Sequence, residues 1–236
     1  MENYYIQKIP KSTAKKMIID NHYTHAWTMC NVALGIFERG INHSFFENTT
    51  DDKLIGCIVY GHPVGRQVIA GISPLVKNGE VFELTRLWIQ DDTPKNTESW
   101  FIGQSFNWLK INKPHIKVLV SYADPNAGHL GKIYQATNWL YQLIENTPDN
   151  DIMISMKGPP NYEWLHPRTL VSKLGFRNKK KLPRPYWYKT IRRKFRYLYI
   201  LTNKCEKKKI LNSLIHPIQP EYPRELDIRS EILECK

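Results

Sequence analysis

Residues 118–139 read VLVSYADPNAGHLGKIYQATNW, and this stretch decides the fold. Its first residues form an apolar, β-branched run, which is typical of a central strand that is covered on both faces. Pro125 cannot donate to a sheet ladder, and turn-forming residues follow it, so we expect the strand to end there and a helix to begin. Polar side chains with chemical function therefore gather at the join, namely Ser121, Asp124 and Tyr134.

This corner between a strand and a helix is the first candidate for an active site. In open α/β sheets, ligands bind at the carboxyl ends of the strands. The alternative is a plain turn, in which Asp124 accepts hydrogen bonds from backbone amides and Tyr134 fills the core. The corner alone does not separate these two interpretations.

Hydrophobic periodicity and turn residues predict the other elements of the chain. Helices are expected over residues 13–21, 98–110, 128–139 and 167–174, and strands over residues 32–37, 54–60, 81–89, 118–124 and 152–156. The strands 32–37 and 54–60 are expected to pair in an antiparallel manner. Basic and aromatic residues alternate over residues 186–201, which predicts a long exposed strand or hairpin. The order of these elements indicates an α/β fold with a mixed sheet.

The composition is typical of a globular protein. Hydrophobic residues make up 42% of the 236 residues, and neither end resembles a signal peptide or an apolar membrane span. The four cysteines are widely spaced and form no CxxC motif, so neither a disulfide framework nor a zinc site is indicated. We expect a cytoplasmic protein that does not enter the membrane. Residues 1–201 are predicted to form its catalytic domain, and residues 202–236 a loosely ordered basic tail.

The net charge of +12 is concentrated in one segment. Residues 177–209 hold fourteen Lys or Arg residues and one acidic residue, and aromatic residues alternate with the charges. Basic side chains neutralise phosphates and aromatic rings stack on bases, so the mixture favours nucleic acid as a partner. The candidate DNA-binding residues, in the basic aromatic region 177–201, are Arg177, Lys179, Lys180, Lys181, Arg184, Tyr186, Trp187, Arg192 and Arg193. The alternative is an edge strand that lysines protect, with its aromatic side chains packed inward.

Two histidines flank a tyrosine just beyond the first predicted helix. His22 and His25 could bind a metal on either side of Tyr23, although the sequence offers no obvious second cluster of ligands. Two hydroxyls, those of Thr97 and Ser99, open a later helix, whose N-terminal amides could hold a phosphate or a carboxylate. Capping of the helix explains these two hydroxyls equally well.

The strand predicted over residues 81–89 carries charges in an apolar run. A buried guanidinium such as that of Arg86 needs a carboxylate or an anionic ligand. Glu83 is expected to be a poor partner for it, because side chains alternate along a strand and these two are predicted to point to opposite faces. Arg86 is therefore a candidate for binding an anion.

The segment of residues 81–139 resembles the core of the GNAT acyltransferase fold. More specifically, residues 12–200 resemble the bacteriophage Mom DNA-modification family. The motifs that carry this resemblance are His22-Tyr23-Thr24-His25, Glu83-Leu84-Thr85-Arg86-Leu87, Glu98-Ser99, Ser121-Tyr122-Ala123-Asp124-Pro125 and Gly128-His129-Leu130-Gly131-Lys132-Ile133-Tyr134.

The resemblance implies a GNAT-like enzyme that converts adenine in double-stranded DNA to an N6-carbamoylmethyl form, which shields phage DNA from restriction enzymes. It implies a small-molecule donor, for which the fold suggests acetyl-CoA or a related compound. However, residues 91–97 contain two acids and no glycine, where acetyltransferases of this fold usually carry a glycine-rich turn that binds pyrophosphate. The family has also been linked to iron, for which His22, His25 and Asp124 are the ligands to test.

The resemblance also suggests roles for individual residues. The catalytic candidates are Asp124, Tyr134, His22, Tyr23 and Arg86, and the donor-binding candidates are Ser99, Ser121 and Thr97. Asp124 is expected to accept a proton from N6, while Tyr134 protonates the leaving group and Arg86 orients an anion. Two alternatives remain from the sequence: an N-acetyltransferase of GNAT type that acts on a protein or a small amine, and a DNA-binding protein without catalytic activity.

Overall fold

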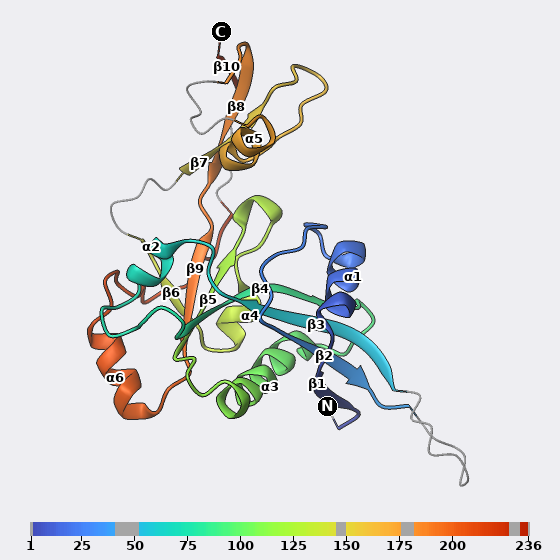
Figure 1. Cartoon of the computed structure of the whole chain (residues 1–236), viewed down its shortest axis with the longest axis vertical. Helices are drawn as coiled ribbons and strands as arrows, with labels where there is room; N and C mark the ends of the chain where they lie inside the picture. Colours follow the sequence, from blue (N-terminus) through green and yellow to red (C-terminus); the bar gives the residue numbers. More distant parts are fainter. Residues whose placement is uncertain (1, 41–51, 145–149, 176–181, 227–231, 236) are drawn as a thin grey trace. The chain divides into compact units, whose positions relative to one another are not determined.

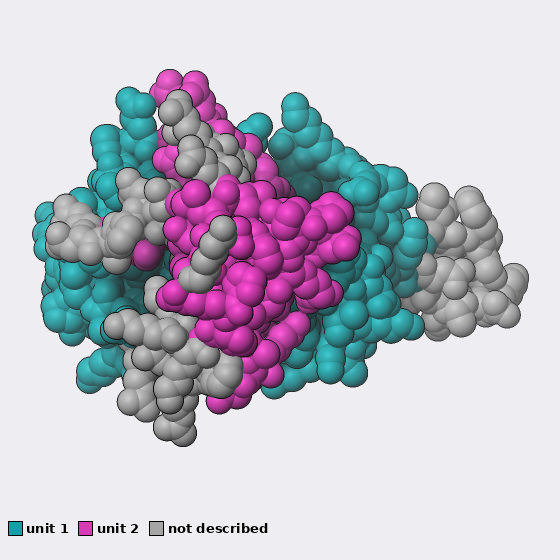
Figure 2. All heavy atoms as spheres, turned by 90° about the horizontal axis from the view of Figure 1, so that it is seen from above, with its two compact units in different colours: residues 1–122, 132–143, 196–221 teal, residues 123–131, 144–195, 222–236 magenta. Residues whose placement is uncertain are grey.

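The computed structural model describes residues 2–40, 52–144, 150–175, 182–226 and 232–235 (Figure 1). The chain divides into two compact units, which Figure 2 shows in different colours. The first unit comprises residues 1–122, 132–143 and 196–221, and the second comprises residues 123–131, 144–195 and 222–236. This division differs from the predicted boundary at residue 201, because the second unit is assembled from three separate segments.

A seven-stranded mixed sheet forms the centre of the first unit. Its strands are β1 (Tyr4–Lys8), β2 (Val32–Glu38), β3 (Lys53–Gly61), β4 (Val81–Ile89), β5 (Val118–Ala123), β6 (Leu140–Gln142) and β9 (Phe195–Ile200). They lie in the order β1-β2-β3-β4-β5-β9-β6. The first four are antiparallel neighbours, which confirms the predicted pairing of β2 with β3, whereas β4 and β5 are parallel. The mixed α/β class predicted from the sequence is therefore confirmed.

Helices cover this sheet. They are α1 (Lys11–Asn21), α2 (Arg66–Ala70), α3 (Thr97–Asn112), α4 (Lys132–Ala136) and α6 (Lys204–Asn212), whereas a short 3-10 helix, η1 (Pro125–Ala127), belongs to the second unit. The succession β4, α3, β5, α4 confirms the GNAT-like core that the sequence predicted. No helix in the described part of the chain is long and apolar enough to cross a membrane.

Helix α4 is shorter than the predicted helix over residues 128–139. Gly128 and Gly131 have φ angles of 80° and 77°, and Asn138 has a φ of 59°. These left-handed backbone conformations cannot continue a right-handed helix. The helix is therefore confined to one short turn segment, which carries Tyr134.

The predicted loose tail begins instead with an ordered helix. Ile210 of α6 is 1% exposed and belongs to the same core cluster as Val118 and Leu198. The Asn203 side chain accepts a hydrogen bond of 2.9 Å from the amide of Glu206 and so caps the start of α6. The sequence prediction missed this helix because four of its nine residues are lysines, which are typical of a solvated tail as well as of a helix.

The prediction of a long exposed strand or hairpin over residues 186–201 is wrong for its second half. Strand β9 enters the main sheet, where Tyr197 and Leu198 are fully buried. Arg196 is also buried, and its guanidinium donates to the carbonyl of Val68 at 3.1 Å. Here the aromatic residues pack inward, as the alternative interpretation expected, but β9 lies between β5 and β6 and is not the edge strand that this alternative assumed.

The second unit is built on a separate three-stranded antiparallel sheet. Strand β8 (Tyr186–Arg192) lies between β7 (Asn150–Ser155) and β10 (Ile232–Cys235). Helix α5 (Pro167–Lys173) packs on this sheet, as predicted for residues 167–174, and its core cluster consists of Ile154, Leu170 and Leu182.

Candidate active site and nucleic-acid surface

A gap opens between the two parallel strands of the first unit. Strands β4 and β5 pair only from Val81 with Val118 to Glu83 with Val120. Beyond that point the Ser121 hydroxyl takes the place of a backbone partner and donates to the carbonyl of Leu84 at 2.9 Å. The separation of the strands therefore places a buried side-chain hydroxyl inside the sheet.

Tyr134 reaches into this gap from α4. Its phenol oxygen lies 2.8 Å from the Ser121 oxygen, and both side chains are buried. A hydroxyl has one proton and a carbonyl can only accept, so Tyr134 donates to Ser121 whenever Ser121 donates to Leu84. The three groups form a chain of hydrogen bonds that starts at the phenol.

Tyr134 is a proton donor and not a base at neutral pH. Burial raises the pKa of Tyr134 to about 12, and the hydrogen bond with Ser121 opposes this rise only in part. The ring packs between Trp139 and Tyr197, with centroid distances of 5.2 and 5.1 Å. The structure thus brings the predicted residues Ser121 and Tyr134 together, and it holds the phenol protonated.

Glu83 and Arg86 lie on the same face of β4, which corrects the predicted arrangement. Val59 of β3 pairs with Arg86, whereas Tyr60 pairs with Leu84, so Thr85 is an extra residue in the strand. This β-bulge shifts the alternation by one residue. The prediction failed because it assumed a regular strand, and Glu83 was consequently absent from the predicted site residues.

Three side chains interact electrostatically with Arg86, namely those of Tyr23, Glu83 and Tyr134. Burial lowers the pKa of Arg86, while the nearby Tyr23, Glu83 and Tyr134 oppose this effect. The guanidinium donates to the carbonyls of Ala26 at 3.1 Å and of Thr85 itself at 2.6 Å. These contacts fix the orientation of the cation beside the buried phenol.

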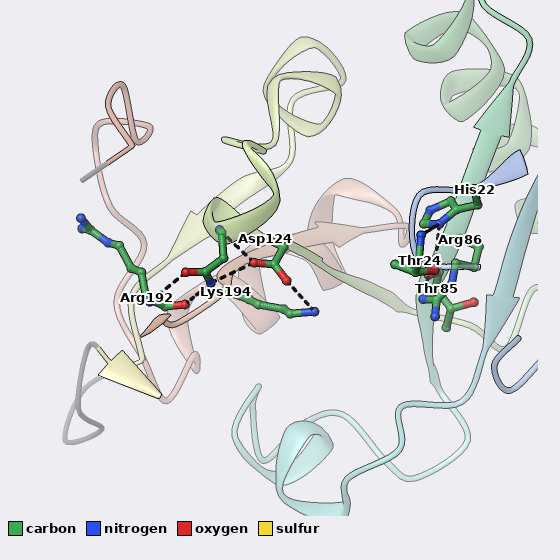
Figure 3. A network of polar contacts seen from close by, with 8 residues as sticks. His22, Thr24, Thr85, Arg86, Asp124, Arg192 and Lys194 are labelled. Atoms are coloured by element: carbon green, nitrogen blue, oxygen red, sulfur yellow. Dashed lines mark hydrogen bonds and ion pairs between the residues drawn. The ribbon is translucent and has the colours of Figure 1, made fainter. Parts of the chain in front are cut away.

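His22 is buried directly behind the exposed ring of Tyr23. The Nδ1 atom of His22 accepts a hydrogen bond of 3.1 Å from the amide of Thr24 and lies 2.9 Å from its hydroxyl (Figure 3). Because Nδ1 accepts, the neutral imidazole carries its proton on Nε2. The rings of His22 and Tyr23 stack with a centroid distance of 4.4 Å, and Tyr23 is 55% exposed. The pair offers a flat aromatic surface.

The predicted metal ligands come from both units of the chain. The Nδ1 atom of His25 donates to the carbonyl of Ile19 at 2.8 Å, and Asp124 belongs to the second unit. Within the described ranges, no group of three His, Cys, Asp or Glu residues could hold a metal ion. The ligand set His22, His25 and Asp124 remains a prediction.

Asp124 caps a turn of the second unit. One carboxylate oxygen accepts from the backbone amide and from the side-chain amide of Asn126, both at 3.0 Å. The other oxygen lies 3.1 Å from the ammonium of Lys194 (Figure 3). The Asn126 side chain in turn holds the backbone of Arg192, at the end of β8. These contacts match the turn interpretation of Asp124, and its role as a base remains a prediction.

A polar cavity of about 400 Å³ lies beside the start of α3. It is lined by Gln90, Asp91, Thr93, Pro94, Lys95, Asn96, Glu98, Ser99, Lys132, Ile133 and Ala136. The hydroxyls of Thr97 and Ser99 donate to the carbonyls of Pro94 and Asn96, at 2.6 and 3.0 Å. Thr97 is fully buried, so both hydroxyls have a structural role, and a contact of either with a donor remains a prediction.

This cavity is a poor fit for the diphosphate of a coenzyme. Asp91 and Glu98 place two carboxylates in its lining, together with the two ammonium groups of Lys95 and Lys132. Two carboxylates beside a diphosphate oppose its binding. Asn96, with a φ of 71°, stands in the left-handed conformation at the helix start, and no glycine lines the cavity. The lining instead offers both charges.

The predicted DNA-binding residues fall into two groups. Arg177, Lys179, Lys180 and Lys181 lie outside the described residues. Arg184, Tyr186, Trp187, Arg192 and Arg193 belong to the second unit and are exposed or half-buried. One of them, Tyr186, packs against the core beside α5. The contact of the others with DNA remains a prediction.

The chain is similar to several known proteins. It is 27% identical over 180 residues to the methylcarbamoylase Mom of Escherichia phage Mu, and the match covers 72% of this chain and 68% of that protein. A probable acetyltransferase from Staphylococcus epidermidis is 9% identical, with a TM-score of 0.42, and covers 84% of this chain and 99% of its own. A GNAT-family acetyltransferase from Streptococcus pneumoniae is 7% identical, with a TM-score of 0.41 and the same two coverages.

The family match includes the site. It extends over residues 3–223 and so contains the phenol of Tyr134, its partner Ser121 and the cation of Arg86. The chain belongs to the Mom protein family.

Proposed function

We propose that this protein transfers a carbamoylmethyl group to N6 of adenine in double-stranded DNA, and that the modification protects phage DNA from host restriction enzymes. Membership of the Mom protein family supports this, as does the phage Mu relative, which is named a methylcarbamoylase. The observation that carries the chemistry is the buried, protonated phenol of Tyr134 beside Arg86. The reaction is expected to take place in the host cytoplasm.

The reaction forms a bond between N6 and the methylene carbon of the donor. The bond from that carbon to its leaving group breaks, and the leaving group departs with the electron pair. Tyr134 supplies a proton to the leaving group, which its raised pKa allows at neutral pH. N6 loses one proton, for which Glu83 and Asp124 are the candidate acceptors. Glu83 lies within electrostatic reach of Tyr134, whereas Asp124 must first give up contacts with Lys194 and Asn126.

The target adenine must leave the base stack before its N6 can react. Extrusion of a base from a duplex costs a few kcal/mol, which stacking and hydrogen bonds in the enzyme offset. The exposed ring of Tyr23, stacked on His22, is a suitable surface for the extruded base. The Nε2 proton of His22 is a hydrogen-bond donor close to this surface.

The donor is a small molecule that does not depend on a diphosphate. The cavity beside α3 holds Asp91 and Glu98 as well as Lys95 and Lys132, so it suits a donor with polar groups of both signs or an amide. Acetyl-CoA is therefore a poor candidate. If iron is required, His22 and His25 are the first residues to test.

Mass spectrometry of nucleosides tests the proposal directly. DNA from cells that express the protein should contain deoxyadenosine in which one N6 hydrogen is replaced by a carbamoylmethyl group. Tyr134→Phe and Arg86→Gln should each abolish most of this product, while the comparison of Glu83→Gln with Asp124→Asn identifies the proton acceptor. Unmodified adenine in cells that contain folded wild-type protein would refute the proposal.

A further inference from the structure

The loop between β7 and α5 is closed at its base. Ile154 and Leu165 exchange two backbone hydrogen bonds, of 2.8 and 2.9 Å. The fully buried hydroxyl of Ser155 accepts from the amides of Lys157 and Glu163, at 3.1 and 2.9 Å. The same hydroxyl donates to the carbonyl of Lys157 at 2.8 Å. The two ends of the loop are therefore held together.

Three aromatic rings support this loop. Tyr162 stacks on Trp164 with a centroid distance of 4.9 Å, and it meets Trp187 of β8 edge-on at 6.4 Å. The ammonium of Lys189 lies 4.8 Å from the centroid of the Trp164 ring. A Cβ atom at Gly158 would lie 2.8 Å from the Trp187 ring, so the backbone approaches this ring as closely as glycine permits. These rings are not members of the core cluster of Ile154, Leu170 and Leu182, to which α5 contributes Leu170.

The rings hold an exposed apolar tip. Pro159, Pro160 and Asn161 are all exposed, and the amide of Asn161 donates to the carbonyl of Gly158 at 3.0 Å. Each proline fixes its own φ angle, so the tip has little conformational freedom. Figure 1 shows the segment as a gold loop that projects from the three-stranded sheet beside α5. The tip is thus both rigid and open to a partner.

The charge around this loop fits a polyanion. Of the described residues of this unit, 150–175 and 182–195 contain eight Lys or Arg residues and two Asp or Glu residues. Lys157 of the loop and Lys173 of α5 share Glu163 as a partner, at 3.1 and 3.9 Å. A basic surface attracts the phosphates of nucleic acid, and their neutralisation releases counterions.

We propose that the loop of residues 156–164 is a wedge that enters duplex DNA with Pro159 and Pro160 at its tip. Proteins that kink DNA insert apolar side chains, proline among them, between neighbouring base pairs. An enzyme that modifies a base inside the duplex needs such help, because the base must first leave the stack. The wedge rests on the proposed function, since it supplies the step that exposes the target adenine.

The test compares a target adenine that is paired with thymine and one that has no pairing partner. Two duplexes are used, which differ only in the position opposite the target adenine: thymine in one, and an abasic site in the other. The tested variant is Pro159→Ser with Pro160→Ser, and the matched control is Pro183→Ser, an exposed proline of the same unit. We expect the double variant to modify the paired adenine at least about tenfold more slowly than wild type. It should modify the adenine opposite the abasic site at nearly the wild-type rate, and the control should behave as wild type on both duplexes.

A second readout is independent of the chemistry. With 2-aminopurine in place of the target adenine, wild type and the control should raise its fluorescence on binding, and the double variant should not. Equal loss on both duplexes, no loss on either, or a full fluorescence rise with the double variant would each overturn the wedge. If wild type modifies neither duplex but still raises the fluorescence, the proposed reaction fails and the wedge stands.

Discussion

Replacement of Tyr134 by phenylalanine removes one buried hydroxyl and leaves its ring in place. The contacts with Trp139 and Tyr197, at 5.2 and 5.1 Å between centroids, can remain. Ser121 can still donate to the carbonyl of Leu84. At about pH 8 the variant should therefore lose the net contribution of one hydrogen bond, about 1 kcal/mol in the free energy of unfolding.

The stability of the same variant relative to wild type should increase in alkaline solution. Burial raises the pKa of Tyr134 from its ordinary value of 10.0 to about 12. A group with a raised pKa stabilises the folded state fully below its unfolded pKa, and this stabilisation is lost as the pH rises through the folded pKa. Between about pH 10 and pH 12, wild type should thus lose about 1.4 kcal/mol per pH unit relative to the variant, or roughly 2 to 3 kcal/mol in all.

Urea unfolding at about pH 8 and about pH 11 measures this difference. At the higher pH, the free energy of unfolding of the variant should no longer be lower than that of wild type, and the two proteins should become about equally stable. Other tyrosines titrate in both proteins, so their effects cancel in the comparison. A deficit that is the same at both pH values would show that Tyr134 titrates as a solvent-exposed tyrosine, which would refute the buried proton donor. Activity should fall at least about a hundredfold in the variant at either pH.

Three further predictions concern the fold. Ile210→Ala should lower the free energy of unfolding by about 2 to 4 kcal/mol, as measured by urea unfolding, whereas Lys209→Ala on the exposed side of α6 should change it by less than about 0.5 kcal/mol. Iodoacetamide at about pH 8 should label the exposed Cys205 and leave Cys57 unreacted, because burial raises the pKa of the Cys57 thiol to about 12. Mass spectrometry of peptides measures the labelling, and a labelled Cys57 would contradict this prediction. Gly61→Ala should lower the melting temperature, since a Cβ there would collide with the backbone before β2, and an unchanged temperature would show that this loop can move away.

The β4 to α4 region could be predicted because its signals are local. A continuous apolar run, a proline and a glycine-containing turn define β5 and its end without reference to the rest of the chain. The meeting of Ser121 with Tyr134 follows from that corner. The contacts of Asp124 also follow, since aspartate before a proline commonly caps a turn.

The predictions that failed concern residues whose burial or pairing depends on contacts with residues far away in the sequence. Basic and aromatic residues alternate in both β8 and β9, yet only β9 is covered by the main sheet and its helices. Whether Tyr197 is buried depends on neighbours such as Tyr134 and Tyr141, which are more than fifty positions earlier in the sequence. Likewise, β10 completes the second unit from the far end of the chain. A single sequence contains no local signal for such pairings.

The extra residue at Thr85 has a consequence for how this site tolerates change. Side chains alternate between the two faces of a strand, and the extra residue reverses this alternation for every later residue of β4. Insertion of one further residue between Glu83 and Arg86, with no second bulge to absorb it, would leave the composition of the strand almost unchanged, yet it would carry Arg86 to the face of the sheet opposite Glu83. Which charged side chains reach the site therefore depends on the number of residues in β4 as well as on their identity.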